Sequence, residues 1–279
     1  MSFNSVNTNR QAVFALQSLN LTNSELSGVQ KRVSTGFRVS DARDDGGAFA
    51  VAQAVRSDVA GVTAVGEQLG GIRGILSTSF AALGVVSDSM KQLRAVITRL
   101  ADAAVTGSTR DQYNTQYVDL TKQIKGFIDD AKYNGRTLLS TDTTVGGGDI
   151  ESIQNETGKV FTIAAVDGDA IKDLLSDAAP ADSGAAVDLI ETGGDFLEAD
   201  KLISSALNQF GSSMQFVENQ IIYNSKKIDA LNDGLGALVD ADLAKESSKL
   251  QALQTRQQLG IQTLGIANQG PQVLLSLFR

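Results

Sequence analysis

Cysteine, histidine and tryptophan are absent from this 279-residue chain, which also has only 2 prolines and 5% aromatic residues. Without Cys or His the chain can form no zinc site of the usual nitrogen and sulfur type, no cysteine nucleophile and no Ser-His-Asp triad. So few large rings also leave a thick globular core short of buried area. We therefore expect a structural protein rather than an enzyme, with no catalytic residue, no cofactor and no metal site.

The net charge of −8 is unevenly distributed along the chain. Residues 140–200 hold 14 acidic residues and two lysines, whereas both ends of the chain are mildly basic. An acidic balance argues against nucleic-acid binding, which needs a basic stripe. No run approaches 18 apolar residues, and the first residues do not read as a secretory signal. These rules alone exclude a membrane span and place the chain in the cytoplasm.

Apolar residues recur at alternating steps of four and three along most of the chain. Over Val51–Leu100, 13 of 15 such positions are apolar. A coiled-coil helix keeps this 3.5-residue period, whereas a strand or an ordinary amphipathic helix does not. Similar seams span Tyr113–Ala131 and Ile203–Leu238, where Asn224 is either a register-fixing polar residue or an exposed one.

Three such seams predict a mostly α fold, a long antiparallel helical bundle or coiled-coil rod. The residues expected to pack it are Ile72, Leu76, Leu83, Met90, Leu93, Ile97, Leu120, Ile124, Phe127, Leu207, Phe210, Met214 and Ile221.

A shorter apolar stripe lies near each end of the chain. The first ends at Thr35-Gly36, and the second follows a break at Asp240-Ala241-Asp242. Each stripe has too few neighbours in its own chain to cover it, so we expect the two to pair and to associate between copies. Folding back onto the central bundle is the alternative. The residues expected to self-associate are Ala12, Leu19, Leu26, Val29, Val33, Leu243, Leu250, Leu253, Ile261, Leu264, Leu275, Leu277 and Phe278.

Residues 140–200 read as a small acidic excursion from the bundle. Val160–Ala164 is β-prone and predicts a hairpin. Gly146–Gly148 is expected to be a flexible break, and residues 176–195 a loop.

This excursion also carries groups with the appearance of sites. Asp167 and Asp169 are spaced like the start of a calcium loop, but the residues that follow break the pattern, so we reject the site. The Asn155-Glu156-Thr157 sequon is interpreted as a chance match. Four hydroxyl-bearing residues near the start of the excursion are candidates for O-glycosylation, namely Ser140, Thr141, Thr143 and Thr144.

Four segments of the chain carry motifs of a known family. Val33–Asp45 contains Ser34-Thr35-Gly36-Phe37-Arg38-Val39 and Ala42-Arg43-Asp44-Asp45, and is similar to the amino-terminal signature of the bacterial flagellin family. Tyr133-Asn134-Gly135 is similar to the turn that ends its second rod helix, and Asp240–Glu246 to the entry to its last helix. Ala267–Arg279 resembles its carboxyl end. Four matches in the right order, over about residues 1–140 and 200–279, are specific where one short motif is not.

The resemblance implies a structural subunit that polymerises into the extracellular bacterial flagellar filament, the propeller of swimming motility. It implies an inner coiled coil from residues 1–35 and 243–279, surrounded by a rod layer. The corresponding division of the chain is 1–43 for the first inner-core helix and linker, 44–139 for the first rod helices, 140–200 for the excursion, 201–239 for the last rod helix and 240–279 for the last inner-core helix.

The resemblance also implies partners. These are further copies or other flagellins, the type III export apparatus with a secretion chaperone, and filament cap and hook-junction proteins, with no nucleic acid and no membrane. Flagellins sensed by the innate-immune receptor tend to carry an Arg and a Glu where this chain has Gln92 and Ala95, so weak recognition is predicted. The hook–filament junction protein, a relative with similar terminal helices, is the alternative function, and a signalling coiled coil a more distant one.

Overall fold

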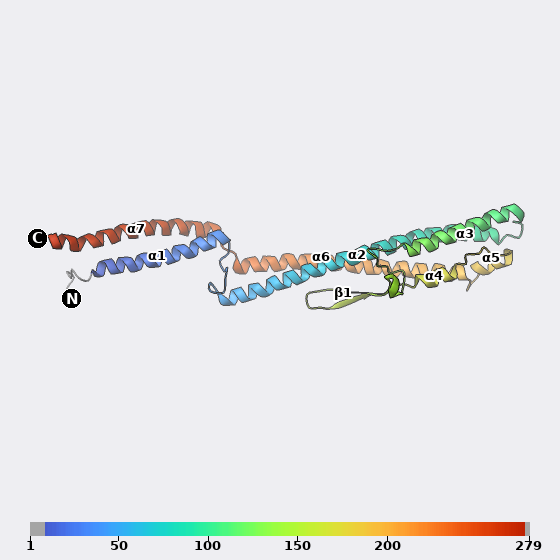
Figure 1. Ribbon diagram of the computed structural model, residues 1–279, viewed down its shortest axis with the longest axis horizontal. Coiled ribbons are helices and arrows are strands. Elements are labelled where there is room, and N and C mark those ends of the chain that lie inside the picture. The colour runs from blue at the N-terminus through green and yellow to red at the C-terminus, as the bar shows by residue number, and fades with distance from the viewer. Residues whose placement is uncertain (1–8, 277–279) are drawn as a thin grey trace. The chain divides into compact units, whose positions relative to one another are not determined.

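The structure consists mainly of long α-helices (Figure 1). This computed structural model describes residues 9–276, with side chains as far as Gln269. Its elements are α1 (Arg10–Thr35), α2 (Gly46–Leu100), α3 (Gly107–Asp129), the short 3-10 turn η1 (Thr143–Val145), β1 (Ile150–Ile153), β2 (Val160–Ile163), α4 (Gly168–Leu174), α5 (Ser183–Ile190), α6 (Asp195–Val239) and α7 (Leu243–Ser276). The mostly α fold with a small hairpin, predicted from the seams, is confirmed.

The chain divides into two compact units. The terminal unit comprises residues 1–59 and 230–279, and the central unit comprises residues 60–229. The long helices α2 and α6 contribute residues to both units.

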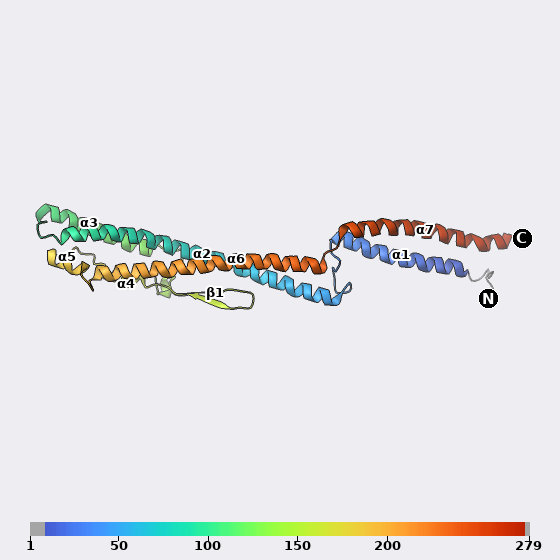
Figure 2. The ribbon, with the colours of Figure 1, turned by 180° about the vertical axis from the view of Figure 1, so that it is seen from behind.

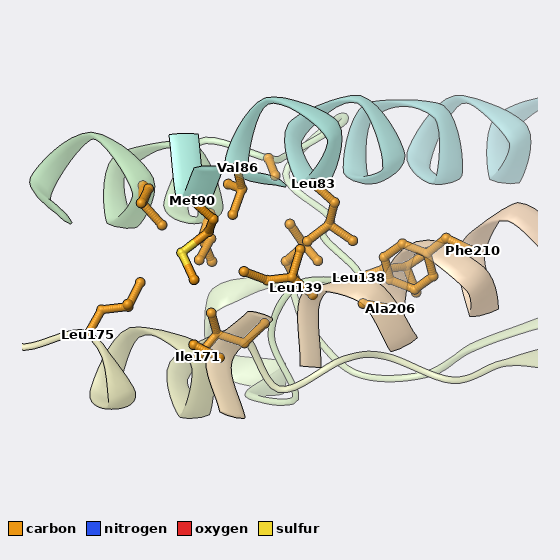
Figure 3. Close-up of a cluster of buried hydrophobic side chains, with 14 of the residues drawn as sticks. Leu83, Val86, Met90, Leu138, Leu139, Ile171, Leu175, Ala206 and Phe210 are labelled. Carbon is orange, nitrogen blue, oxygen red and sulfur yellow. The ribbon is translucent and has the colours of Figure 1, made fainter. Parts of the chain in front are cut away.

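The apolar seam of α2 forms the core of the central unit. From Val62 to Leu100 every seam position is buried, including the polar Ser79, whose Oγ accepts a hydrogen bond from the backbone N–H of Leu138 at 3.5 Å. Four parts of the chain meet in this core (Figure 3). They are α2 with Leu83, Val86 and Met90, the segment after α3 with Leu138 and Leu139, α4 and the residue after it with Ile171 and Leu175, and α6 with Ala206 and Phe210.

Most of the residues named for rod packing lie in or against this core. Phe127 of α3 is the exception, because its side chain is 38% exposed and lies outside the core cluster. The buried members are Ile72, Leu76, Leu83, Met90, Leu93, Ile97, Ile124 and Phe210, and the half-buried members are Leu120, Leu207, Met214 and Ile221.

Helix α2 is also long and apolar enough, by length and composition alone, to cross a membrane. One such helix is weak evidence, because the core helix of a protein without a membrane span passes the same test. Protein already covers the seam of α2 from Val62 onward.

The excursion is more helical than the sequence predicts. The loop expected over residues 176–195 is wrong for Ser183–Ile190, which forms α5, and α6 already begins at Asp195. The side chain of Asp182 accepts a hydrogen bond from the backbone N–H of Ala185 and caps α5, and Ala186 is buried in the core. One cap and one buried face are enough to hold a helix too short to show a period.

The two carboxylates that opened the rejected calcium pattern have structural partners. Asp167 caps α4 by accepting the backbone N–H of Ala170, and Asp169 pairs with Lys172 at 2.6 Å. Lys172 also reaches Asp129 of α3 at 2.6 Å, so it ties α4 to α3.

The glycine run at the base of the excursion is a packed turn, which corrects the flexible break expected there. The backbone N–H of Gly147 donates to Asp142 O at 3.0 Å, and that of Gly148 to Ser140 O at 2.8 Å. A Cβ on Gly147 would lie 2.3 Å from the carbonyl oxygen of Ser140, closer than any real contact. Glycine is therefore required at this position by close approach of the backbone.

The predicted Asn134-Gly135 turn is present and carries out a packing role. Both residues have positive φ, 49° and 76°, as a type I′ turn requires. The flanking Tyr133 and Arg136 exchange backbone hydrogen bonds of 2.8 and 3.0 Å. The ring of Tyr133 lies over Gly74 of α2, where a Cβ would be 2.8 Å from Cζ. A glycine that weakens the helix thus makes room for an aromatic ring.

Replacing Gly147 with Ala is expected to destabilise the central unit by about 2 kcal/mol, because the new methyl group must displace the Ser140 carbonyl. Urea unfolding of the full chain measures the change. The matched control is Gly84→Ala in α2, where a Cβ meets nothing within 4 Å and helix propensity predicts a gain of up to ~1 kcal/mol. Equal stability of Gly147→Ala and the parent would show that the turn is loose.

Candidate assembly surface

Helices α1 and α7 form an antiparallel pair within the terminal unit (Figures 1 and 2). Polar contacts link the two helices in opposite chain order. Asn9 Nδ2 donates to Ala267 O at 2.7 Å, Gln257 Nε2 to Asn23 Oδ1 at 2.7 Å, and Arg32 Nη1 to Glu246 Oε1 at 3.2 Å. The terminal stripes therefore pair with each other within one chain.

The apolar seam between these helices is short. Leu26, Val29 and Leu253 are buried in it, with Val33 and Leu250 packed against them. The other described members of the expected self-association set are not part of this cluster. Ala12, Leu19 and Leu264 are half-buried, and Leu243 and Ile261 are exposed. The side chain of Leu275 lies outside the described side chains, and Leu277 and Phe278 lie outside the described residues.

Large apolar side chains remain exposed on α1, on both sides of its seam. Val13, Phe14, Leu16 and Leu21 are 59%, 65%, 47% and 62% exposed. Successive residues of a helix are about 100° apart. Val13 and Leu16 therefore lie on one flank of the seam, and Phe14 and Leu21 on the opposite flank.

Helix α7 repeats this arrangement. Leu243 and Ile261 flank its seam on one side, and Leu259 and Ile266 on the other, with exposures between 49% and 69%. We call these eight exposed residues of α1 and α7 the apolar flanks.

The sequence analysis missed most of the flanks, because a search for a single stripe with a 3.5-residue period assigns all positions outside that stripe to solvent. The signal was an excess of apolar residues out of phase with the stripe. The overlooked members are Val13, Phe14, Leu16, Leu21, Leu259 and Ile266.

The two linkers that end the helix pair bind each other. Phe37 and Asp240 form an antiparallel bridge, in which the backbone N–H of Arg38 donates to Val239 O at 2.7 Å and that of Ala241 to Gly36 O at 2.9 Å. The linker 36–45 and the segment 239–242 are thus held together by backbone hydrogen bonds where they leave the helix pair.

A charge cluster fastens the first linker to α1. Lys31 Nζ lies 2.8 Å from an oxygen of Asp41 and 2.9 Å from one of Asp44. The hydrogen bond from Lys31 lowers the pKa of Asp41 from 3.8 to about 2 and holds that of Asp44 well below its usual range, while both carboxylates raise the pKa of Lys31. The contribution of this cluster to folding stability is fully present above about pH 4, and it is lost as pH falls through the lowered pKa values of Asp41 and Asp44. All three groups are solvent-accessible, so the contribution is small.

Among the described residues, no group of three or more Asp, Glu, Cys or His side chains is arranged to hold a metal ion. The apolar flanks are chemically suited to contact with other apolar surfaces. They lie on α1 and α7, the two helices that the sequence resemblance predicts to form an inner coiled coil.

Comparison with known proteins identifies the family. The model of the bacterial flagellin N-terminal helical region matches residues 6–144, and that of the C-terminal helical region matches residues 198–278. Flagellin FljK of Caulobacter vibrioides is 34% identical and flagellin FljM of the same organism 32% identical, each over 100% of both chains. A flagellin of Brucella melitensis is 33% identical over 99% of both chains.

A crystal structure of Bacillus cereus flagellin is also similar, with a TM-score of 0.49 and 23% identity over 57% of this chain and 88% of that one. The assignment rests on the sequence relatives. Since these are named flagellins over their full length, they do not favour the alternative of a hook–filament junction protein. This chain belongs to the bacterial flagellin family and is a structural subunit of the extracellular flagellar filament.

Proposed function

We propose that the apolar flanks of α1 and α7 join copies of this chain in the filament. The observation that carries the proposal is their placement on both sides of a seam that the two helices already cover. A closed pair of chains would cover one flank and leave the other in water. Two flanks instead require different neighbours, and contacts between unlike patches generate an open helical polymer.

The same proposal assigns the parts of the chain to layers. Residues 1–43 and 240–279 form the inner layer, 44–139 and 201–239 the surrounding rod layer, and 140–200 an excursion toward the outside. The support is chemical. Exposed apolar side chains on α1 and α7 need cover, whereas the excursion holds 14 acidic residues against two lysines and is favoured in contact with water.

The family is structural, and we propose that this chain has no catalytic role and takes no cofactor. Its proposed partners are further copies or other flagellins, the type III export apparatus with a chaperone, and the cap and hook-junction proteins. Freedom from Cys suits passage through an export channel, because no disulfide can form on the way.

The variant Phe14→Glu/Ile266→Glu is expected to abolish assembly while leaving the chain folded. Both side chains are more than 60% exposed, so charge costs the free chain little, but burying two carboxylates in a contact between copies is strongly unfavourable. Seeded growth followed by sedimentation and electron microscopy measures assembly, and circular dichroism measures folding.

The matched control is Gln17→Glu/Gln262→Glu, which adds the same charge at exposed polar positions of the same helices. Filaments from the Phe14/Ile266 variant at the parent's rate would refute the assembly role of the flanks. Long tubes from a chain lacking residues 1–35 and 243–279 would refute the assignment of the inner layer.

Weak innate-immune recognition remains a proposal for the exposed face of α2. Gln92 and Ala95 are exposed there, at the positions where sensed flagellins tend to carry Arg and Glu. Gln92→Arg/Ala95→Glu is expected to raise receptor activation by at least about tenfold, since two charged contacts are worth over 1.4 kcal/mol together. A cell reporter assay on monomer measures it, and strong activation by the unchanged chain would contradict the proposal.

O-glycosylation is proposed for Thr141, Thr143 and Thr144, which are exposed. Ser140 is a poorer acceptor, because it is buried and its Oγ accepts the backbone N–H of Asp142 at 3.1 Å. Intact mass spectrometry of filaments is expected to give more than the bare 29.3 kDa, with the excess on a peptide that contains these threonines. The bare mass alone would rule the modification out.

A further inference from the structure

The tip of the β-hairpin, residues 154–159, is an ordered structure in its own right. β1 and β2 pair from Ile150↔Ile163 to Ile153↔Val160. Beyond them, the side-chain oxygen of Asn155 accepts three hydrogen bonds, from the N–H and hydroxyl of Thr157 at 3.2 and 2.7 Å and from the N–H of Lys159 at 3.1 Å. The sequon residues therefore shape the tip.

One face of α6 holds this hairpin along its length. Nearest its base, Gln209 Nε2 donates to Ala164 O at 2.8 Å, and the rings of Phe216 and Phe161 stack with centroids 4.2 Å apart. The residues that hold the tip are Gln220, Asn224 and Lys227, which follow at spacings of four and three and so share this face.

The contacts at the tip are polar, directional and shielded from water. Gln220 and Asn224 both donate to the carbonyl of Gln154, at 3.1 and 3.4 Å, and Gln220 also donates to Asn224 Oδ1 at 3.0 Å. Asn224 is only 2% exposed, so its side chain is the buried polar residue of the third seam. Lys227 pairs with Glu156, whose side chain is 18% exposed.

The same tip also touches α2. Glu156 lies against Gly61, where an added Cβ would be 3.1 Å from the Glu156 Cβ. One residue of the hairpin thus contacts α2 through its Cβ and α6 through its carboxylate.

We propose that the hairpin tip is a clamp that stops α2 and α6 from sliding past each other. Apolar seams with a regular repeat offer similar contacts after a shift of one turn, and packed helices can move by such steps. The ion pair has no equivalent partner one turn away, because a shift of α6 by one turn brings Tyr223 or Leu231 to the place of Lys227 opposite Glu156. The tip therefore fixes the register that a repeating seam leaves unspecified.

The test uses the full chain with spin labels at Ala64→Cys in α2 and Ser212→Cys in α6, both exposed positions in a chain without other cysteines. Ser212 follows Gly211, which faces Phe80 of α2, so the two labels are offset by about 24 Å along the helices and a slide along the helix axis changes the distance between them. In the release variant, residues 154–159 are replaced by Asn-Gly, a two-residue type I′ connection that keeps the Ile153↔Val160 pairing. Pulsed electron resonance is expected to show one narrow distance in the parent and, in the variant, a distribution broadened or shifted by about 5 Å, the rise of one helical turn.

A milder pair of variants decides the question if the release variant does not fold. Lys227→Met removes an ammonium that reaches from α6 to the tip, whereas Lys201→Met removes one whose pair with Glu198 lies within α6. The clamp predicts a broadened distance for Lys227→Met and the parent distance for Lys201→Met. A parent-like distribution in Lys227→Met, and in the release variant where it folds, would overturn the proposal and make the hairpin a passive attachment.

Discussion

The central unit depends on one constraint, the need to cover the apolar seam of α2. Every seam position from Val62 to Leu100 is buried, and no single partner helix supplies that cover. α3 and α6 contribute aliphatic and aromatic side chains, the segment after α3 contributes Leu138 and Leu139, and the excursion contributes Ile171 and Leu175. The acidic middle of the chain is therefore part of the core as well as of the surface. Its charges lie outside while its apolar residues complete the packing around α2.

The terminal unit faces the same constraint with fewer elements. Two helices can bury one seam between them, and α1 and α7 do so with Leu26, Val29 and Leu253. They cannot bury two further flanks each. The central unit buries its apolar seam within one chain, whereas the terminal unit leaves its apolar flanks exposed.

Residue periodicity predicted the long helices and their buried faces, because a 3.5-residue repeat over 50 residues has one structural solution. The polar interruptions could not be interpreted in the same way. Ser79 and Asn224 look like defects in a seam, but each is buried and bonded to the backbone of a segment distant in sequence. The sequence analysis missed helix α5 and the packed turn at Gly147. The features that stabilise them, a helix cap and a close backbone contact, produce no repeating pattern in the sequence. The flanks were missed for the opposite reason, because the dominant stripe concealed them.

The antiparallel pairing of α1 with α7 has a consequence for the order of folding. Arg32 and Glu246 are 214 residues apart in sequence, so every contact of this pair closes a loop that contains the whole central unit. Long loops are slow to close, and a chain that emerges from one end has only half of the pair until the last segment appears. The central unit can form its contacts from nearer neighbours at an earlier stage. The helix pair that carries the proposed assembly surface is thus completed last, so the topology itself delays contact between copies until the chain is whole.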